Sequence, residues 1–179
     1  MTELPKSKGT ERCPLTIDSH NTKMRLQPIT RSDLDYVCLK LRESDKREIF
    51  GIRSHDNPLW IAAETLCVAS YGKAAIAFYD GKPAAVIGVS PKPWPHVWDA
   101  WAYGTDDFNK VGLSLTRYAL KVLKPYLLAR QVHRLEAPSR MDHSQAHSWL
   151  RALGATDEAI LRSYGRDGAD YVMFSWTRK

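Results

Sequence analysis

The stretch 73-KAAIAFYDGKPAAVIGV-89 decides the fold of this chain, because it places two short apolar runs on either side of Asp80-Gly81. Runs of this length, bounded by turn residues, are typical of buried strands. The Asp-Gly dipeptide favours the two-residue turn whose twist matches that of two paired strands. The pattern therefore predicts an antiparallel hairpin with strands at Lys73–Tyr79 and Lys82–Val89.

Downstream of the hairpin, a proline-rich connection at residues 91–95 leads into the alternating segment Val97–Gly104, which predicts a third strand of the same sheet. From Phe108 to Arg130 the apolar period becomes that of a helix, and Pro125 is expected to kink or shorten it. The predicted apolar face of this helix carries Leu115, Ala119, Val122 and Tyr126.

Upstream of the hairpin, Lys23–Ile29 is a short strand signal, and Thr30 begins a helix with Asp33 placed to return to the cap. The buried stripe of that helix follows the helical period and consists of Leu34, Val37, Cys38 and Leu41. A second helix is predicted from Asn57 or Pro58 to Gly72, since proline is favourable in a first turn.

The last part of the chain is predicted to add a strand, a helix and two further strands. These are the strand Val132–Ala137, the helix that Asp142 caps and Gly154 closes, and the strands Ala159–Tyr164 and Asp170–Trp176 around a turn at Asp167-Gly168. The predicted fold class is α+β, an α/β/α sandwich with a mixed, mostly antiparallel sheet of about seven strands and four flanking helices.

The length of 179 residues indicates one domain, which we place at residues 23–179 behind a polar, flexible tail at residues 1–22. A hydrophobic fraction of 44% and a charged fraction of 26% exclude a chain that is disordered throughout. Apolar stretches such as Ala84–Val89 are far shorter than the roughly 20 residues that cross a bilayer, so no membrane association is expected. The tail has no secretory pattern, which predicts a cytoplasmic protein.

The spacing of the cysteines and the distribution of charge indicate which metals, ligands or proteins the chain is expected to bind. Cys13, Cys38 and Cys67 are odd in number and widely spaced, which favours free thiols over disulfides or a zinc ribbon. The net charge of +6 lies entirely in residues 110–179, where 12 Lys/Arg face 6 Asp/Glu. A basic half indicates an anionic partner, such as a phosphate-bearing cofactor or an acidic protein surface. Nucleic acid is an unlikely partner, because no nucleic-acid-binding motif is present.

Two segments carry a resemblance to a known family. They are 24-MRLQPITRSDLDYVCLKL-41 and 142-DHSQAHSWLRALGA-155, and the second keeps the spacing of Ala146 and Gly154. The chain from Met24 to Trp176 resembles the GCN5-related N-acetyltransferase (GNAT) superfamily, and within it the GNAT-like proteins of podovirus-type phages. It departs from the family pattern where His143 replaces an asparagine, Leu150 an aromatic residue and Ala155 a phenylalanine.

The resemblance implies acetyl-CoA as the cofactor, bound where the fourth and fifth strands splay, with its diphosphate at the start of the following helix. Unpaired amides and the positive end of the helix dipole favour phosphate there. By motif position the implied cofactor-binding residues are Ala102, Gly104, Asn109, Lys110, Gly112, Ser114 and His143. Asp106 and Asp107 precede that helix and could instead cap it, which leaves open a fold without its cofactor.

Acetyl transfer needs a deprotonated amine, a polarised carbonyl and a proton for the leaving thiolate. Asp99 on the third hairpin-sheet strand is the first candidate base, and Glu136 on the next strand is the second. The family's aromatic acid is missing at Leu150, so Tyr103 or Tyr164 would have to replace it. The absence of an acid at Leu150 argues against efficient catalysis.

No metal site is predicted, although His143 and His147 share a helical face and His133 lies on the preceding strand, because a further ligand is lacking. Two functions remain open. One is an acetyl-CoA-dependent N-acyltransferase acting on an amine acceptor, which could be a host protein. The other is a non-catalytic GNAT-like phage protein, either a virion or assembly component or a factor that binds and modulates a host enzyme. Either would reside in the host cytoplasm or, for the second, in the virion.

Overall fold

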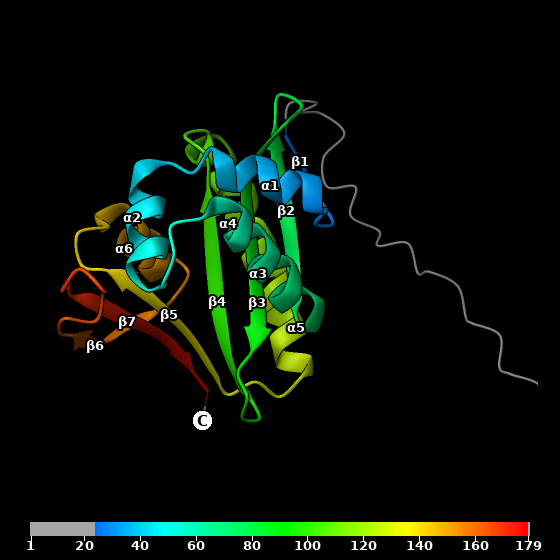
Figure 1. The fold of residues 1–179 in the computed structure, drawn as a ribbon. Coiled ribbons are helices and arrows are strands. Elements are labelled where there is room, and N and C mark those ends of the chain that lie inside the picture. The colour runs from blue at the N-terminus through cyan, green and yellow to red at the C-terminus, as the bar shows by residue number, and fades with distance from the viewer. Residues whose placement is uncertain (1–23, 179) are drawn as a thin grey trace, which may run out of the picture.

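The computed structural model describes residues 24–178, so the predicted tail at residues 1–22 and Cys13 lie outside the described residues. The described chain forms one seven-stranded sheet with the order β1-β2-β3-β4-β5-β7-β6 (Figure 1). Every neighbouring pair is antiparallel except β4 and β5, which are parallel. The predicted α+β class with a mostly antiparallel sheet is confirmed.

The elements follow one another in an order close to the predicted one. The strands are β1 (Met24–Gln27), β2 (Lys73–Tyr79), β3 (Lys82–Pro91), β4 (Val97–Gly104), β5 (Arg134–Arg140), β6 (Thr156–Leu161) and β7 (Tyr171–Thr177). The helices are α1 (Arg31–Leu39), α2 (Glu43–Gly51), α3 (Pro58–Tyr71), α4 (Phe108–Tyr118), the π-helical segment η1 (Ala119–Leu123), α5 (Lys124–Ala129) and α6 (Ser144–Ala152).

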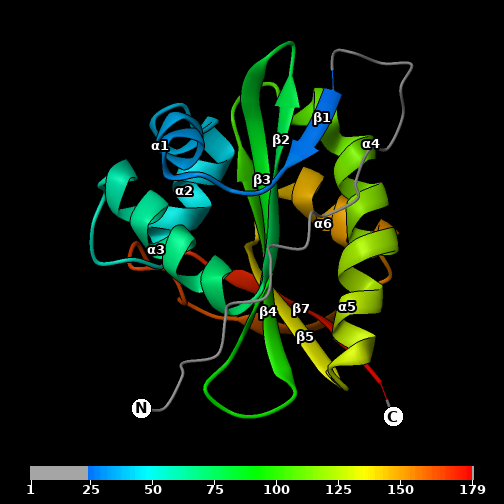
Figure 2. The same ribbon diagram turned by 90° about the vertical axis from the view of Figure 1, so that its right-hand side faces the viewer.

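The helices cover the sheet on both sides, with α1, α2 and α3 on one face and α4, α5 and α6 on the other (Figure 2). The first face packs a core of Leu34, Val37, Ile61, Ile76, Val86 and Tyr103. The second face packs a larger core that includes Ala85, Ile87, Val89, Trp98, Val111, Leu115 and Leu127. Apolar side chains thus leave both faces of β3 and β4, which is why these central strands read as continuous apolar runs.

The hairpin that decides the fold forms as predicted, with Lys73 opposite Val89 and Tyr79 opposite Lys82. Asp80 and Gly81 both have positive φ angles, 49° and 77°, as the twisted two-residue turn requires. The predicted caps of the first helices are also confirmed. Thr30 accepts from the Asp33 amide at the start of α1, and Asn57 caps α3 ahead of Pro58.

The helix α2 was not predicted, and the expected number of four helices was too low. Its sequence, ESDKREIFG, has no apolar stripe at helical spacing, because the apolar pair Ile49 and Phe50 stands only at its end. Its fully buried residues are Asp45 and Gly51 rather than large apolar side chains. Hydrophobic periodicity therefore cannot detect a helix whose buried side chain is a carboxylate.

The long helix predicted at residues 108–130 is present but changes register in the middle. In η1 the Lys124 amide donates to the carbonyl of Ala119, five residues back, so this turn holds one extra residue. The spacing of the buried residues therefore lengthens to five between Tyr118 and Leu123. Of the predicted apolar face, Leu115 is fully buried, and Ala119, Val122 and Tyr126 are partly buried and pack against the same core. The buried residues of this helix are Phe108, Val111, Leu115, Tyr118, Leu123 and Leu127. The wider turn precedes Pro125, whose ring would clash with the carbonyl four residues back in a regular helix.

The end of the chain differs from the prediction mainly at element boundaries. Asp142 does not cap α6, since its carboxylate pairs with Arg47 and Arg140 and the cap residue is His143. Gly154 closes this helix with a φ of 87°, as expected. Among residues 24–178, no helix has the length and apolar character that a membrane span requires.

Candidate functional site

The two parallel strands at the centre of the sheet begin together and then diverge. Their pairing covers Val97 with Arg134, Trp98 with Leu135 and Asp99 with Glu136, and stops there. Both strands continue, β4 to Gly104 and β5 to Arg140, without pairing to each other (Figure 1). We call the paired beginning the closed end and the diverging part the open end.

Strand alternation shows which amides face the gap. The Thr105 amide donates to Ala84 of β3, so the even-numbered residues of β4 turn their amides toward β5. In a parallel pair the residue after a register partner donates to the opposite strand, so the Ala100 amide is used by the Asp99–Glu136 step. This leaves Ala102 and Gly104 at the open end. On β5 the Arg140 amide faces the gap, and the position two residues earlier is Pro138, which has no N–H.

Two carboxylates of α2 accept hydrogen bonds from the strand amides at the far limit of the open end. Asp45 Oδ2 lies 2.8 Å from the Gly104 nitrogen of β4, and Glu48 Oε2 lies 2.9 Å from the Arg140 nitrogen of β5. The Ser139 hydroxyl also donates to Glu48 Oε2, at 2.8 Å. One helix thus satisfies an exposed amide on each of two strands, because Asp45 and Glu48 are three residues apart and project from the same side.

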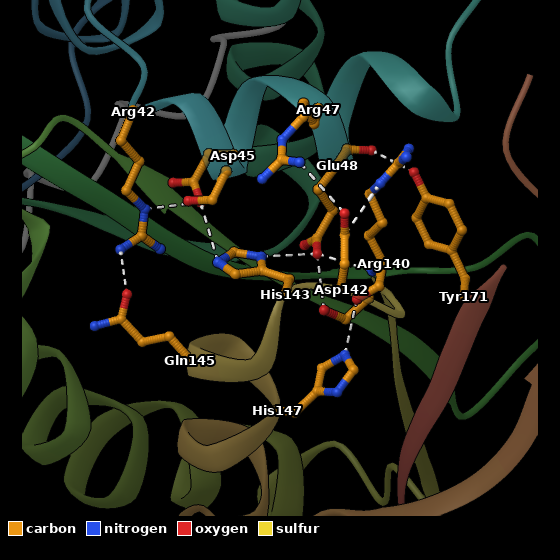
Figure 3. A network of polar contacts seen from close by, with 12 residues as sticks. Arg42, Asp45, Arg47, Glu48, Arg140, Asp142, His143, Gln145, His147 and Tyr171 are labelled. Carbon is orange, nitrogen blue, oxygen red and sulfur yellow. Dashed lines mark hydrogen bonds and ion pairs between the residues drawn. The ribbon is translucent and has the colours of Figure 1, made fainter. Parts of the chain in front are cut away.

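His143, the cap residue of α6, lies between these two carboxylates (Figure 3). Its Nδ1 is 2.9 Å from Glu48 Oε2, and its Nε2 is 3.8 Å from Asp45 Oδ1. The ring is only 7% exposed, and Nε2 has no hydrogen-bond partner among the described residues. Arg42 completes this cluster, with its Nε 2.8 Å from Asp45 Oδ1 and its guanidinium over the ring of Phe108.

Burial raises the pKa of Asp45 above its ordinary value, and the positive charge of Arg42 and the Gly104 amide oppose this effect. Removing a carboxylate from water costs free energy unless charge and hydrogen bonds compensate it. Here the compensation comes from Arg42, Gly104 and His143 together.

Once these contacts are taken into account, Ala102 is the one residue of the described strands whose backbone N–H still points into the gap. Gly104 is occupied by Asp45, Arg140 by Glu48, and Pro138 has no amide to offer. The gap belongs to a cavity of about 1050 Å³ whose lining includes Ala102, Glu48 and His143. The open end therefore presents a single backbone donor to a large cavity.

The cavity extends to both faces of the sheet. On the α2–α3 side its wall includes Ile49, Ile52, Thr65, Val68 and Trp101, together with Tyr164. On the other side the wall is more strongly apolar and includes Leu120, Leu123, Leu127, Trp149, Leu150 and Leu153. Two molecules that approach from opposite faces can meet beside β4.

The predicted bases Asp99 and Glu136 lie at the closed end, side by side, and share a cation. Lys92 Nζ is 3.0 Å from Asp99 and 2.9 Å from Glu136, and Arg134 also pairs with Glu136. Burial raises the pKa of Asp99, an effect that Lys92 opposes and the nearby Glu136 reinforces. Burial also acts to raise the pKa of Glu136, but hydrogen bonds from Arg134 and Lys92 outweigh it and lower that pKa.

The structure separates the two predicted tyrosines. Tyr103 is buried on the α1–α3 face, where its hydroxyl is hydrogen-bonded to Thr65 and near Cys38, and burial raises its pKa well above the usual value. Tyr164 is half exposed in the loop after β6, packs against Tyr171 and lines the cavity. The two hydroxyls therefore do not form one group.

The start of α4 holds the remaining predicted residues. Thr105, rather than an aspartate, receives the first amides, since its hydroxyl accepts from Asp107 and its carbonyl from Phe108. The Asp107 side chain makes no capping hydrogen bond. Gly112 is the fifth residue of the helix, so its amide points to an intrahelical carbonyl, while a Cβ built on it meets open space.

Asn109, Lys110 and Ser114 lie on the same helix, but only Asn109 reaches α6. The Gln145 amide donates to the Asn109 side chain at 2.8 Å, and further along Trp149 Nε1 donates to Thr116 at 2.9 Å. Ser114 instead directs its hydroxyl toward the sulfur of Met24. These contacts join α4 and α6 over the apolar side of the cavity.

Arg42, Asp45 and Glu48 were missed by the sequence reading. The available signal was the pair of carboxylates three residues apart in ESDKREIF, which places both on one side of a helix. What the sequence could not reveal was that two orphan strand amides lie in front of them, because that depends on the splay of β4 from β5.

No protein-family model matches the sequence, and a search of curated proteins finds no match. Solved structures do match. A ribosomal-protein-alanine N-acetyltransferase from Brucella melitensis superposes with a TM-score of 0.68 at 16% identity, over 86% of this chain and 99% of that one. An N-acetyltransferase from Staphylococcus aureus Mu50 gives a TM-score of 0.69 at 11% identity, over 88% and 100%.

A third match is YncA from Salmonella typhimurium, solved with its cofactor acetyl-CoA. It gives a TM-score of 0.65 at 13% identity, over 87% of this chain and 94% of that one. Between 94% and 100% of each of these chains is covered. The chain therefore has the fold of the GNAT acetyltransferases.

Proposed function

We propose that this protein is an acyl-CoA-dependent N-acyltransferase. The observation that carries the proposal is the single amide of Ala102 that faces a cavity reaching both sides of the sheet. A preorganised N–H donor in a site shielded from water stabilises the charge that develops on a carbonyl oxygen during acyl transfer. Neighbouring edge amides are occupied by Asp45 and Glu48, so a carbonyl entering the gap is directed to Ala102.

Acetyl-CoA supplies an acyl group on a thioester, and the cavity fits its acyl and pantetheine portion. The wall between α4–α5 and α6 is apolar along Leu120, Leu123 and Leu150, which suits an uncharged chain. Ala102 orients the carbonyl at the inner end of this wall. Lys110, exposed in the first turn of α4, is the cation nearest in sequence to the proposed diphosphate site.

An amine acceptor would approach from the α2–α3 side, where the cavity wall carries Trp101 and Tyr164. The solved neighbour from Brucella melitensis acts on the alanine of a ribosomal protein, so a peptide that begins with alanine is our first acceptor probe. A lysine-rich peptide is the second. Asp99, Glu136, Tyr103 and Tyr164 remain predictions as proton-transfer groups.

Calorimetric titration with acetyl-CoA tests the proposal directly. We expect saturable binding, and we expect Gly112→Glu to weaken it at least about tenfold, because the new carboxylate would stand beside the diphosphate. Leu113→Glu is the matched control, since Leu113 is 62% exposed and adds the same charge on another side of the same helical turn. Absence of heat and of thermal stabilisation at millimolar acetyl-CoA would remove the enzyme proposal.

The second candidate is a non-catalytic GNAT-like protein, of the kind that serves a phage as a virion component or a modulator of a host enzyme. It is favoured by the contacts of Gln145 with Asn109 and of Trp149 with Thr116, which tie α4 to α6 across the cofactor side. It is also favoured by Leu150, which has no proton to give. The titration separates the two candidates, since only the first requires acetyl-CoA to bind.

A further inference from the structure

We propose that His143 is the proton-transfer residue of this acyl transfer, and that Glu48 is the positioning residue that holds its ring. The inference rests on the proposed function and deepens it. Neither group belongs to the pair of carboxylates that the sequence suggested as bases. His143 was expected to contact the cofactor because of its motif position, and its geometry assigns it a different role.

The first step of the argument is the state of the imidazole ring. Glu48 Oε2 already accepts from the Arg140 amide and the Ser139 hydroxyl, and it is an acceptor when ionised. The Nδ1 atom of His143, 2.9 Å away, must therefore carry a hydrogen and donate it. A neutral ring fixed in this way has its lone pair on Nε2.

The second step concerns the free nitrogen. Nε2 is buried and has no hydrogen-bond partner among the described residues, although buried ring nitrogens normally have one. His143 lines the same cavity as Ala102 and Gln145. An unpartnered acceptor on a residue of the cavity wall is suited to take a proton from a substrate that reaches it.

The third step concerns the charge that appears once Nε2 gains that proton. Asp45 Oδ1 lies 3.8 Å from Nε2, and Glu48 holds the opposite side of the ring. An imidazolium ion between two carboxylates is stabilised by both. The charged groups around the ring are Arg42, Asp45 and Glu48 from the α2 side and Arg140 and Asp142 from the β5–α6 side (Figure 3).

The proposed step balances without any further reagent. The amine nitrogen bonds to the thioester carbonyl carbon, the carbon–sulfur bond breaks, and the electron pair leaves with sulfur. His143 Nε2 accepts the proton that the amine loses and donates it to the departing thiolate. A single group can serve as base and then acid in this way. This would account for a site without an aromatic acid at position 150.

His147 provides a matched control on the same helix. It is equally buried, at 6% exposure, but its Nε2 is bonded to the Arg140 carbonyl at 2.9 Å, and it does not line the cavity. Its substitution tests what the loss of a buried histidine from α6 does to folding alone. Asp99→Asn tests the base predicted from the sequence.

The experiment measures thiol release from acetyl-CoA, with water and with the two peptide probes as acceptors. We expect His143→Gln to lower kcat at least about 100-fold while KM for acetyl-CoA stays within about twofold. The acid limb of the wild-type pH profile should disappear in this variant. His147→Gln should keep kcat within about threefold and retain that limb.

A second measurement does not depend on turnover. In a long-range ¹H–¹⁵N spectrum of the imidazole rings, neutral His143 should be the tautomer with hydrogen on Nδ1, and its Nε2 signal should move when acetyl-CoA is added. The His147 signals should not move. Glu48→Gln, which keeps an acceptor but loses the charge, should lower kcat about tenfold and leave acetyl-CoA affinity unchanged.

The outcomes separate this inference from the proposed function. If acetyl-CoA binds and thiol is released, but His143→Gln retains the wild-type kcat and pH profile, the inference is overturned and the acyltransferase proposal stands. Loss of turnover in Asp99→Asn but not in His143→Gln would restore the base predicted from the sequence. If acetyl-CoA does not bind, or binds without any release of thiol, both proposals fall.

Discussion

The two ends of the β4–β5 pair use similar charged residues in opposite ways. At the closed end, Lys92 lies between Asp99 and Glu136, and a cation holds two carboxylates together over strands that are already paired. At the open end, His143 lies between Asp45 and Glu48, and these carboxylates replace the missing strand partners. At the closed end the carboxylates lie on strands that already pair with each other. At the open end they accept the hydrogen bonds that a neighbouring strand would otherwise accept.

The two ends differ in the group that lies between the two carboxylates. At the closed end the group between the carboxylates is the Lys92 ammonium, which pairs with both Asp99 and Glu136. At the open end the group between the carboxylates is an imidazole, and its Nε2 has no hydrogen-bond partner among the described residues. The buried carboxylates of the open end accept hydrogen bonds from amides that the splay leaves without a strand partner.

The largest structural effect is expected from breaking the open end at Asp45. Asp45→Ala would leave Arg42 without its buried partner and the Gly104 amide without an acceptor, which should cost about 3–5 kcal/mol of stability. Asp99→Ala at the half-exposed closed end should cost less than about 1 kcal/mol. Urea unfolding of both variants checks the comparison, and equal losses would contradict it.

A smaller effect is expected from the glycine that ends β4. A Cβ at Gly104 would lie 2.4 Å from the Ala84 carbonyl oxygen and 2.9 Å from Ala85, so Gly104→Ala should destabilise the fold by about 1–3 kcal/mol. Gly112→Ala is the control, because its Cβ meets open space in a helix and should stabilise by up to about 1 kcal/mol. Thermal unfolding should therefore move in opposite directions for the two alanines.

The smallest effect is expected at Glu136 and depends on pH. Its pKa in the folded protein is lowered, so its contribution is present above the unfolded pKa and is lost as pH falls through the folded one. Glu136→Gln should cost about 1–2 kcal/mol at pH 7, and the gap to wild type should close below about pH 4. Urea midpoints at several pH values test this, and a gap that persists in acid would refute it.

The sequence predicted the parts of the fold that depend on local patterns. The Asp80-Gly81 hairpin, the cap at Thr30 and the closing glycine at position 154 each follow from one or two residues. The helix α2 could not be found this way, because it buries a carboxylate where an apolar stripe would be expected. The fully buried positions after Tyr118 could not be found either, because one extra residue in η1 lengthens the spacing from Tyr118 to Leu123.

The candidate site was predictable only in its location. The resemblance pointed to the strand ending at Gly104 and to His143, and the structure brings these two regions together. The roles of Asp45 and Glu48 depend on which strand amides lack partners, and that is a property of β4 and β5 in three dimensions. Pro138 is the one sequence feature that marks the edge without an amide.

The π turn at Ala119–Leu123 holds one residue more than a regular helical turn, and it forms part of the cavity wall. Removal of one residue between Tyr118 and Leu123 would restore a regular helix, because these two buried positions would then be four residues apart instead of five. Leu123 and Leu127 would then stay on the buried side, and the change would fall on the turn itself, where Ala119 and Leu120 line the cavity. A deletion of three bases in this short stretch of the gene would therefore act as a change of pocket shape, although no side chain in the pocket need be replaced.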